Sequence, residues 1–128
     1  MTPFGLQLSD LRRRRGLQQQ QLADLLQVAP CYISAMEKGR KGPPTEHLLE
    51  AITTGLQLTP EEKTALLRAA ECSQRQRRVP KDVSVHEYAL VDELWKRLGS
   101  ISQAEATAIS SILKINQKET NDEEYLTL

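Results

Sequence analysis

The chain has 128 residues, which is enough for one compact domain or two small modules but leaves no room for a large enzyme pocket. With 39% hydrophobic residues, only 4% aromatic residues and abundant Leu, Ala, Gln and Glu, the composition favours an all-α fold. The formal net charge of zero argues against a nucleic-acid partner. The charge is unevenly distributed, however: residues 1–44 carry seven Lys and Arg against three Asp and Glu, and residues 45–128 carry an excess of Asp and Glu. The first part is therefore the one expected to face a polyanion.

The first predicted helix covers Pro3 to Arg15. Thr2 is suited to cap it, and Pro3 suits its first position because a proline has no N–H to leave unpaired there. Gly16 is expected to end the helix. The apolar residues that recur at helical spacing and predict its inward face are Phe4, Leu8 and Leu11.

Residues 19–38 have the steric pattern of a helix-turn-helix, in which two short helices cross closely at a steep angle. Ala23 is small at the point where a larger side chain would hold the second helix away from the first, and Val28 fits the turn. Pro30 is expected to begin the second helix and Gly39 to end it. The apolar residues predicted to face inward are Leu22, Leu26, Ile33 and Met36. The second helix of such a pair is left exposed and fits the major groove of DNA.

Two further helices are predicted over residues 45–54 and 59–72. Gly55 is expected to stop the first of them, and the pair Thr59 and Glu62 forms a capping box at the start of the second. The residues expected to face inward are Leu48, Leu49 and Ile52 on the first helix and Ala65, Leu66 and Ala69 on the second. These five helices are predicted to form one module, residues 1–72.

Residues 73–83 have no apolar periodicity and include Pro80, so they are interpreted as a linker. Two interpretations of its basic residues stay open: they contact phosphates, or they belong to a solvated connector. The basic residues are Arg75, Arg77, Arg78 and Lys81.

Two more helices are predicted within residues 84–117. Capping boxes begin each of them, Ser84 with Glu87 and Ser102 with Glu105, and Gly99 separates the two. Two short helices cannot bury this much apolar surface alone, so they are expected to pack on the first module or on a second chain. The residues assigned to this seam are Val91, Leu94, Trp95, Leu98, Ile101, Ala104, Ala108, Ile112 and Ile115. Residues 118–128 are acidic and are predicted to form a mobile tail.

The cysteines and histidines predict neither a disulfide framework nor a metal site. Cys31 and Cys72 are far apart in the sequence, and His47 and His86 have no partners at the spacing of metal ligands. The sequence shows no set of nucleophile, base and acid, no phosphate loop, no leader and no membrane span. We therefore expect a cytoplasmic protein that is not an enzyme and has no cofactor.

From about Phe4 to Leu58 the chain resembles the lambdoid repressor and Cro family of helix-turn-helix regulators, also called the Xre family. The matching elements keep their spacing without a gap: Phe4-Gly5, Leu8, Leu11-Arg12, Gly16-Leu17, Gln19, Leu22-Ala23, Val28, Ile33-Ser34, Glu37-Lys38-Gly39 and Pro44. The resemblance implies a five-helix, lambda-repressor-like DNA-binding domain, here followed by two C-terminal helices.

The resemblance also implies roles for individual residues. Gln19 would contact phosphate and support the base-reading helix, and Arg12 would form an ion pair with Glu37 that ties the first helix to the third. The simpler alternative for Arg12 is a solvated member of the basic run Arg12 to Arg15. The positions implied to face the bases are Pro30, Cys31, Tyr32, Ser34 and Ala35, and those implied to contact the DNA backbone are Lys38, Arg40 and Lys41.

The sequence departs from the family pattern in three places. Gln18 stands where the family prefers Ser, Thr or Asn as a cap. Gln27 replaces the glycine of the turn, so a residue with a side chain is expected to take a positive φ. At the reading positions, Pro30, Cys31 and Ala35 cannot form bidentate hydrogen bonds to a base, which leaves direct readout to Tyr32, Ser34 and Arg40 or Lys41, supplemented by DNA shape.

The main hypothesis is a homodimeric transcriptional repressor that places residues 30–38 in the major groove of an operator and dimerises through its C-terminal helices. The alternative is a protein-interaction module of the same fold, such as an antitoxin, whose C-terminal helices bind a partner protein, for example a toxin or an anti-repressor.

Overall fold

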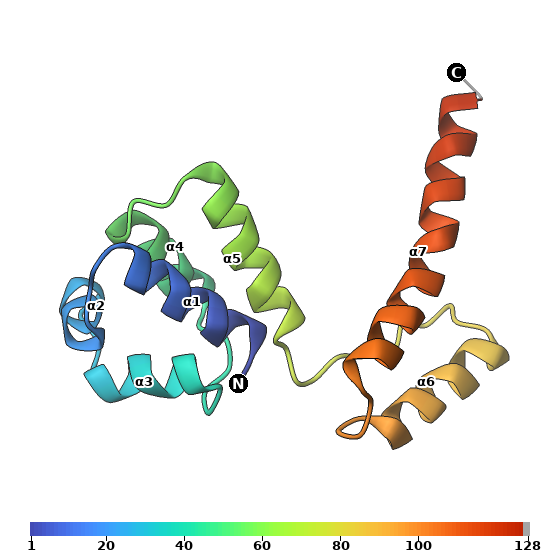
Figure 1. Cartoon of the computed structure of the whole chain (residues 1–128), viewed down its shortest axis with the longest axis horizontal. Helices are drawn as coiled ribbons and strands as arrows, with labels where there is room; N and C mark the ends of the chain where they lie inside the picture. Colours follow the sequence, from blue (N-terminus) through green and yellow to red (C-terminus); the bar gives the residue numbers. More distant parts are fainter. Residues whose placement is uncertain (127–128) are drawn as a thin grey trace. The chain divides into compact units, whose positions relative to one another are not determined.

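In a computed structural model of the chain, the backbone is described for residues 1–126 and the side chains for residues 1–115. The described part contains seven α-helices and no strand (Figure 1), which confirms the predicted all-α class. The helices are α1 Pro3–Arg14, α2 Gln19–Leu26, α3 Pro30–Lys38, α4 Glu46–Gly55, α5 Pro60–Cys72, α6 Val85–Arg97 and α7 Gln103–Leu126. They belong to two compact units, Met1–Arg78 and Val79–Leu128. Among the described residues, no helix combines the length and the apolar character that crossing a membrane requires.

Local sequence signals set the helix starts. The Thr2 hydroxyl accepts a hydrogen bond from the Gly5 N–H at 3.0 Å, which satisfies one of the free donors at the start of α1. At the start of α5, the Thr59 hydroxyl accepts from the Glu62 N–H at 3.2 Å while the Glu62 carboxylate accepts from the Thr59 N–H at 3.0 Å. The same reciprocal pair forms at α6 and at α7, so all three predicted capping boxes are confirmed.

The first unit has a single hydrophobic core to which each of its five helices contributes. The large side chains that are fully buried in it are Phe4, Leu8, Leu11, Leu22, Ile33, Met36, Ile52 and Leu66. The N-terminal turn of α1 packs very closely on the end of α3, because a Cβ atom added to Gly5 would lie 2.7 Å from the Glu37 carbonyl oxygen. Glycine at this position therefore lets α1 and α3 approach at backbone distance.

One detail of the predicted inward face of α5 and one of the predicted end of α4 are wrong. On α5 the buried residues are Leu66 and Ala70, whereas Ala65 is exposed, because α5 meets α1 along the face that carries the larger leucine. The helix α4 ends one residue later than predicted, since Gly55 is its last helical residue and the buried Leu56 follows. The left-handed conformation falls on Gln57 instead, with φ 50°.

The first unit extends beyond the predicted module boundary at residue 72. The Ser73 side chain is buried, and its hydroxyl accepts a hydrogen bond from the Phe4 N–H at 2.8 Å and donates to the Ala69 carbonyl at 2.7 Å. Arg75 donates to the Gly39 carbonyl at 3.3 Å. The segment predicted as a linker therefore begins as part of the first unit, which ends at Arg78.

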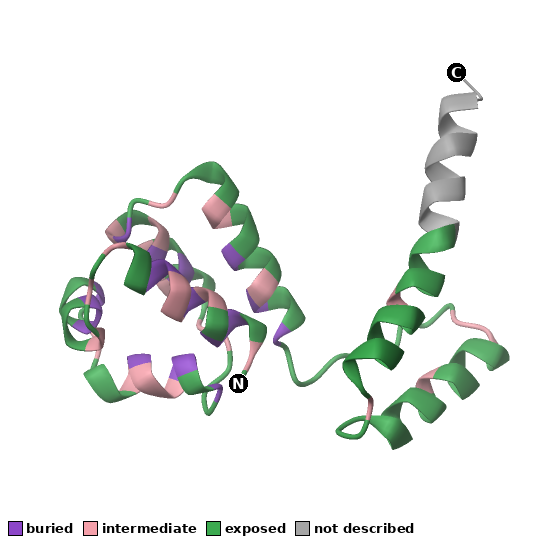
Figure 2. Cartoon of the chain, viewed as in Figure 1, coloured by how far each residue is buried: buried purple, intermediate pink, exposed green. Residues whose placement is uncertain are grey.

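The second unit consists of α6 and α7. No side chain of α6, Val85–Arg97, is buried, as Figure 2 shows by its green and pink ribbon. Arg97 forms an ion pair with Glu105 at 2.8 Å across the turn between the two helices, and this hydrogen bond, together with the Ser102 N–H, lowers the pKa of Glu105.

The helix α7 is longer than predicted. It continues from residue 117 to Leu126, through most of the segment predicted as a tail. The physical reason is that residues 117–126 contain good helix formers and neither Gly nor Pro to end the helix. Residues 127–128 of that predicted tail lie outside the described residues.

Candidate nucleic-acid interface

The turn between α2 and α3 has the sharp geometry that the sequence pattern predicts. Gln27 takes the left-handed conformation with φ 57° and ψ 43°, which confirms the prediction of a positive φ at this position. The Val28 N–H donates to the Ala23 carbonyl at 3.0 Å, and the Ala23 side chain is fully buried between the two helices. The small residue and the left-handed turn together bring α3 across α2.

A buried ion pair fixes α3 to α1. Arg12 donates from Nε and Nη2 to the two carboxylate oxygens of Glu37, both at 2.9 Å, and from Nη1 to the Leu17 carbonyl at 2.7 Å. The side chains are only 10% and 6% exposed. Gln19 adds a longer hydrogen bond from its amide to Glu37 at 3.4 Å, so α2 joins the same network. The orientation of α3 is therefore set by charge-assisted bonds as well as by its apolar side.

The two sides of α3 differ sharply in burial. Its inward side consists of Ile33, Met36 and Glu37, all buried. The structure places the residues implied to face the bases as follows: Pro30 and Cys31 are exposed, whereas Tyr32, Ser34 and Ala35 are half-buried. Tyr32 also packs against the hydrophobic core. The outward surface is thus small and weakly polar, apart from the tyrosine.

A basic turn follows the last residue of α3. Lys38 is exposed, and Gly39 ends the helix with φ 79°. The N–H groups of Arg40 and Lys41 both donate to the Ala35 carbonyl, at 2.9 and 3.2 Å, so this turn is bonded back onto the helix. Three cationic side chains, all exposed, therefore lie at one end of α3 on a fixed backbone.

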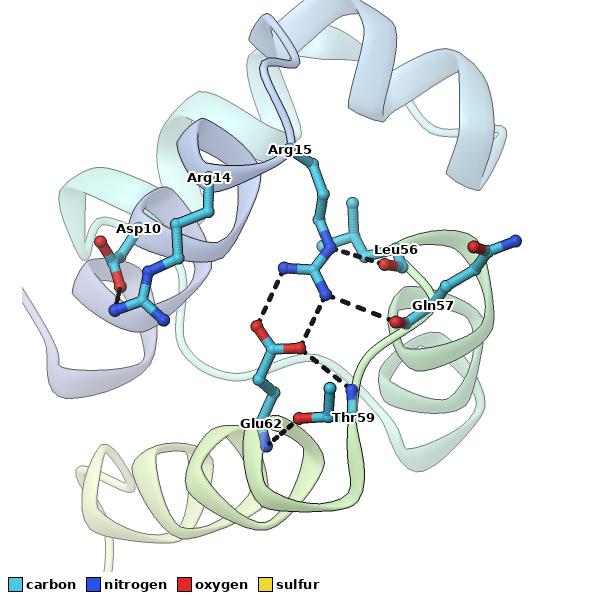
Figure 3. Close-up of polar contacts among 7 residues, drawn as sticks. All are labelled: Asp10, Arg14, Arg15, Leu56, Gln57, Thr59 and Glu62. Carbon is cyan, nitrogen blue, oxygen red and sulfur yellow. Dashed lines mark hydrogen bonds and ion pairs between the residues drawn. The ribbon is translucent and has the colours of Figure 1, made fainter.

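Arg15 has a structural role that the sequence analysis missed (Figure 3). Its guanidinium binds the Glu62 carboxylate through two hydrogen bonds of 2.7 and 2.9 Å and donates from Nε to the Leu56 carbonyl at 2.6 Å. These bonds join the end of α1 to the corner between α4 and α5. The hydrogen bond from Arg15, with that from the Thr59 N–H, lowers the pKa of Glu62 to about 2, and the same pair raises the pKa of Arg15.

The basic run Arg12 to Arg15 is divided by the fold. Arg12 and Arg15 are engaged with carboxylates inside the first unit, and Arg14 pairs with Asp10 at 2.8 Å on the surface. Arg13 is exposed. The available sequence signal for the partner of Arg15 was the capping-box residue Glu62. Its carboxylate can accept further hydrogen bonds after it has capped the start of α5.

On the second unit, an apolar groove lies between α6 and α7. Its lining includes Leu94 and Ile101, which the sequence analysis assigned to the seam, and three residues that it missed: Leu90, Ile109 and Leu113. The spacings Leu90 to Leu94 and Ile109 to Leu113, one helical turn each, were the available signal. The assigned residues outside the groove lining are Val91, Trp95, Leu98, Ala104, Ala108, Ile112 and Ile115, of which all but the half-buried Val91 are exposed.

The described residues contain no group of three or more His, Cys, Asp or Glu side chains placed to hold a metal ion. Cys31 and Cys72 are both free thiols and exposed.

The model of a family described as a helix-turn-helix domain matches residues 3–67 of this chain. A solved structure described as the SinR protein/SinI protein complex is 18% identical in sequence, with a TM-score of 0.44, and the similarity covers 90% of this chain and 98% of that chain. No curated protein matches the chain. The family match covers α1 to α4 and most of α5, which includes the crossed helix pair and the ion pair that holds it. The chain therefore belongs to the helix-turn-helix family of DNA-binding domains, in agreement with its resemblance to the Xre regulators.

Proposed function

We propose that the protein is a sequence-specific, homodimeric transcriptional repressor that inserts α3 into the major groove of its operator. The observation that carries the proposal is the two-sided character of α3: its inner side is locked by the core and by Arg12, while its outer side is free and leads into a basic turn. A rigid, exposed helix followed by cations suits a groove flanked by phosphates. Because its partner is DNA, we also propose a cytoplasmic location.

In this proposal the outward residues of α3 have different roles. Tyr32 and Ser34 carry most of the direct readout, because they have the hydroxyl groups on this face, and Cys31 and Ala35 offer apolar contact to a thymine methyl group. Lys38, Arg40, Lys41 and Gln19 bind the backbone, and Pro30 fixes the helix start. Few strong base readers are present, so DNA shape contributes to the choice of operator.

The test begins with selection of bound sequences from random DNA, followed by titration of the selected duplex. We expect Ser34→Ala together with Tyr32→Phe to weaken binding to the selected duplex more than binding to a scrambled duplex, because both changes remove hydroxyl groups and leave the packing of the tyrosine ring. The matched control is Arg68→Gln, a change of one exposed side chain on α5. If the double variant keeps the full preference for the selected duplex, α3 does not read the bases in this way.

Dimerisation through α6 and α7 is supported by the apolar surface of the second unit. Trp95 is 59% exposed and Ile112 66% exposed, and large apolar side chains recur along both helices. Small units with so few buried side chains generally need association to be stable, and contiguous exposed apolar surface of this kind marks an interface. A second copy of the chain covers the surface with two-fold symmetry and also brings two reading helices together.

Light scattering after size exclusion tests this arrangement on the full chain. We expect a mass of twice the 14.4 kDa of one chain and a shift toward the single-chain mass in Trp95→Gln. Lys96→Gln is the matched control, because the neighbouring lysine is exposed and pairs with Asp92 on its own helix. A single-chain mass that persists when the wild-type protein is bound to DNA would refute the dimer.

The second candidate is an antitoxin or another protein-interaction module, favoured by the same apolar groove between α6 and α7. Its occupant is then a helix of a partner protein such as a toxin or an anti-repressor. Co-expression with the products of neighbouring genes separates the two candidates. A stable complex with one small protein, formed at the expense of the homodimer, favours this second function.

A further inference from the structure

The segment after α5 is attached to the edge of α3, although the two are far apart in the sequence. Ser73 anchors the segment to the start of α1, and Arg75 Nη2 donates to the Gly39 carbonyl at 3.3 Å. Gly39 is the residue at which the basic turn begins. Figure 1 shows the ends of α3 and α5 on the same side of the first unit, next to the N-terminus.

This arrangement gathers two basic segments of the first unit, neither of which itself contains a carboxylate. Residues 38–45 and 72–78, both in the first unit, together contain six Lys and Arg and no Asp or Glu, and Glu46 and Glu71 directly adjoin them. Glu37, which directly precedes the first segment, is neutralised by Arg12. The edge formed by the end of α3 and the segment after α5 is therefore strongly positive.

The side chains of the second segment are not equivalent. Arg77 is turned back to the Glu71 carbonyl, to which Nη2 donates at 2.6 Å. Arg75 uses one of its five N–H donors on Gly39, which leaves donors for a further acceptor. Arg78 is exposed and follows three residues later in a non-helical stretch, so its Cα lies within about 11 Å of that of Arg75.

We propose that Arg75 and Arg78 extend the DNA-binding surface by contacting backbone phosphates next to those contacted by Arg40 and Lys41. The proposal rests on the proposed function and adds a segment outside the helix-turn-helix to the interface. Phosphate groups carry no sequence information, so these two arginines raise affinity and fix the position of the domain without reading bases.

The experiment measures the binding of the full chain to a labelled selected duplex and to a labelled scrambled duplex over a range of salt concentrations. The slope of log K against log salt is negative, and it becomes less steep by about 0.9 for each lost phosphate contact. We expect Arg78→Gln to reduce the slope by about 0.9 and Arg75→Gln with Arg78→Gln by about 1.8. At about 0.1 M salt this corresponds to about eightfold weaker binding per contact, equal for both duplexes.

Arg68→Gln removes one exposed charge from α5 near Thr64 and Ala65 and is the matched control, with an unchanged slope expected. Arg75→Gln also removes the hydrogen bond to Gly39 and so can destabilise the fold. If the double variant melts at a lower temperature than wild type, the salt slope of Arg78→Gln alone is the test of the inference. If the wild-type protein binds DNA strongly and Arg78→Gln keeps the wild-type slope, this inference is overturned while the proposed function stands. A wild-type protein that binds neither duplex at low salt overturns the proposed function with it.

Discussion

Removal of one partner from the buried pair of Arg12 and Glu37 is expected to destabilise the first unit severely. Glu37→Gln leaves the Arg12 guanidinium 10% exposed and opposite a neutral amide, with only the Leu17 carbonyl as its remaining acceptor at full strength. An uncompensated buried charge of this kind costs about 3 kcal/mol of unfolding free energy. In a unit of this size, that loss corresponds to a fall of roughly 12–24 °C in melting temperature.

A double-mutant cycle isolates the pair from the packing of its side chains. We expect Arg12→Met and Glu37→Leu each to lower the unfolding free energy strongly. The double variant should lose clearly less than the sum of the two single losses, because two apolar side chains leave no charge unpaired. The coupling energy is expected to be about 2 kcal/mol. Thermal and urea unfolding of the full chain, followed by circular dichroism, provides both numbers.

The exposed pair of Asp10 and Arg14 is the control for this cycle. Its ion pair is as short, at 2.8 Å, but its side chains are 48% and 61% exposed. Arg14→Gln is therefore expected to cost less than about 0.5 kcal/mol. If Glu37→Gln costs no more than Arg14→Gln, or if the costs of the two apolar substitutions simply add, then the pair does not lock α3 as we argue.

Three further predictions concern the same unit. The lowered pKa of Glu62 means that its ionised form stabilises the fold above its ordinary value of 4.5, and this stabilisation is lost as the pH falls toward about 2. At pH 7 the wild-type protein should therefore have a higher melting temperature than Glu62→Gln, and this difference should disappear between about pH 4.5 and 2. A constant difference in melting temperature over this range would contradict the role of the bond to Arg15. Gly5→Ala is expected to cost about 2 kcal/mol in urea unfolding, since its Cβ would meet backbone atoms, whereas Gly42→Ala, which meets nothing within 4 Å, should be neutral; equal effects would argue against close packing of α1 on α3. Gln27→Gly should raise stability by about 0.5–1 kcal/mol because glycine adopts the left-handed turn without strain, and a loss of stability would mean that the Gln27 side chain makes a compensating contact.

Most of the helix starts and the crossing of α2 and α3 could be predicted from the sequence, because the signals are local. Thr59 and Glu62 are three residues apart, and so are the other capping pairs, so their hydrogen bonds depend only on the first turn of the helix. The positive φ of Gln27 was predictable from its place in the turn of the family pattern. That of Gln57 was not, because it depends on the burial of Leu56 in a core made by other helices.

The exposure of the residues implied to face the bases could be predicted only in part from the sequence. The resemblance implied five base-facing residues on α3, and only Pro30 and Cys31 of these are exposed. Tyr32 is half-buried against the core, which periodicity could not indicate, since the exact rotation of α3 is set by the network of Arg12, Glu37 and Gln19.

The sequence by itself determined where the helices lie, which residues cap them and that the second and third form a helix-turn-helix, since caps and helical stripes act over a few residues. Only the tertiary structure decided which partners the arginines have. Arg15 is engaged by a carboxylate 47 positions away, whereas Arg75 is brought to the end of α3 across 36 positions. Such pairings depend on how the helices cross, so they cannot be predicted from the positions of the two residues in the sequence.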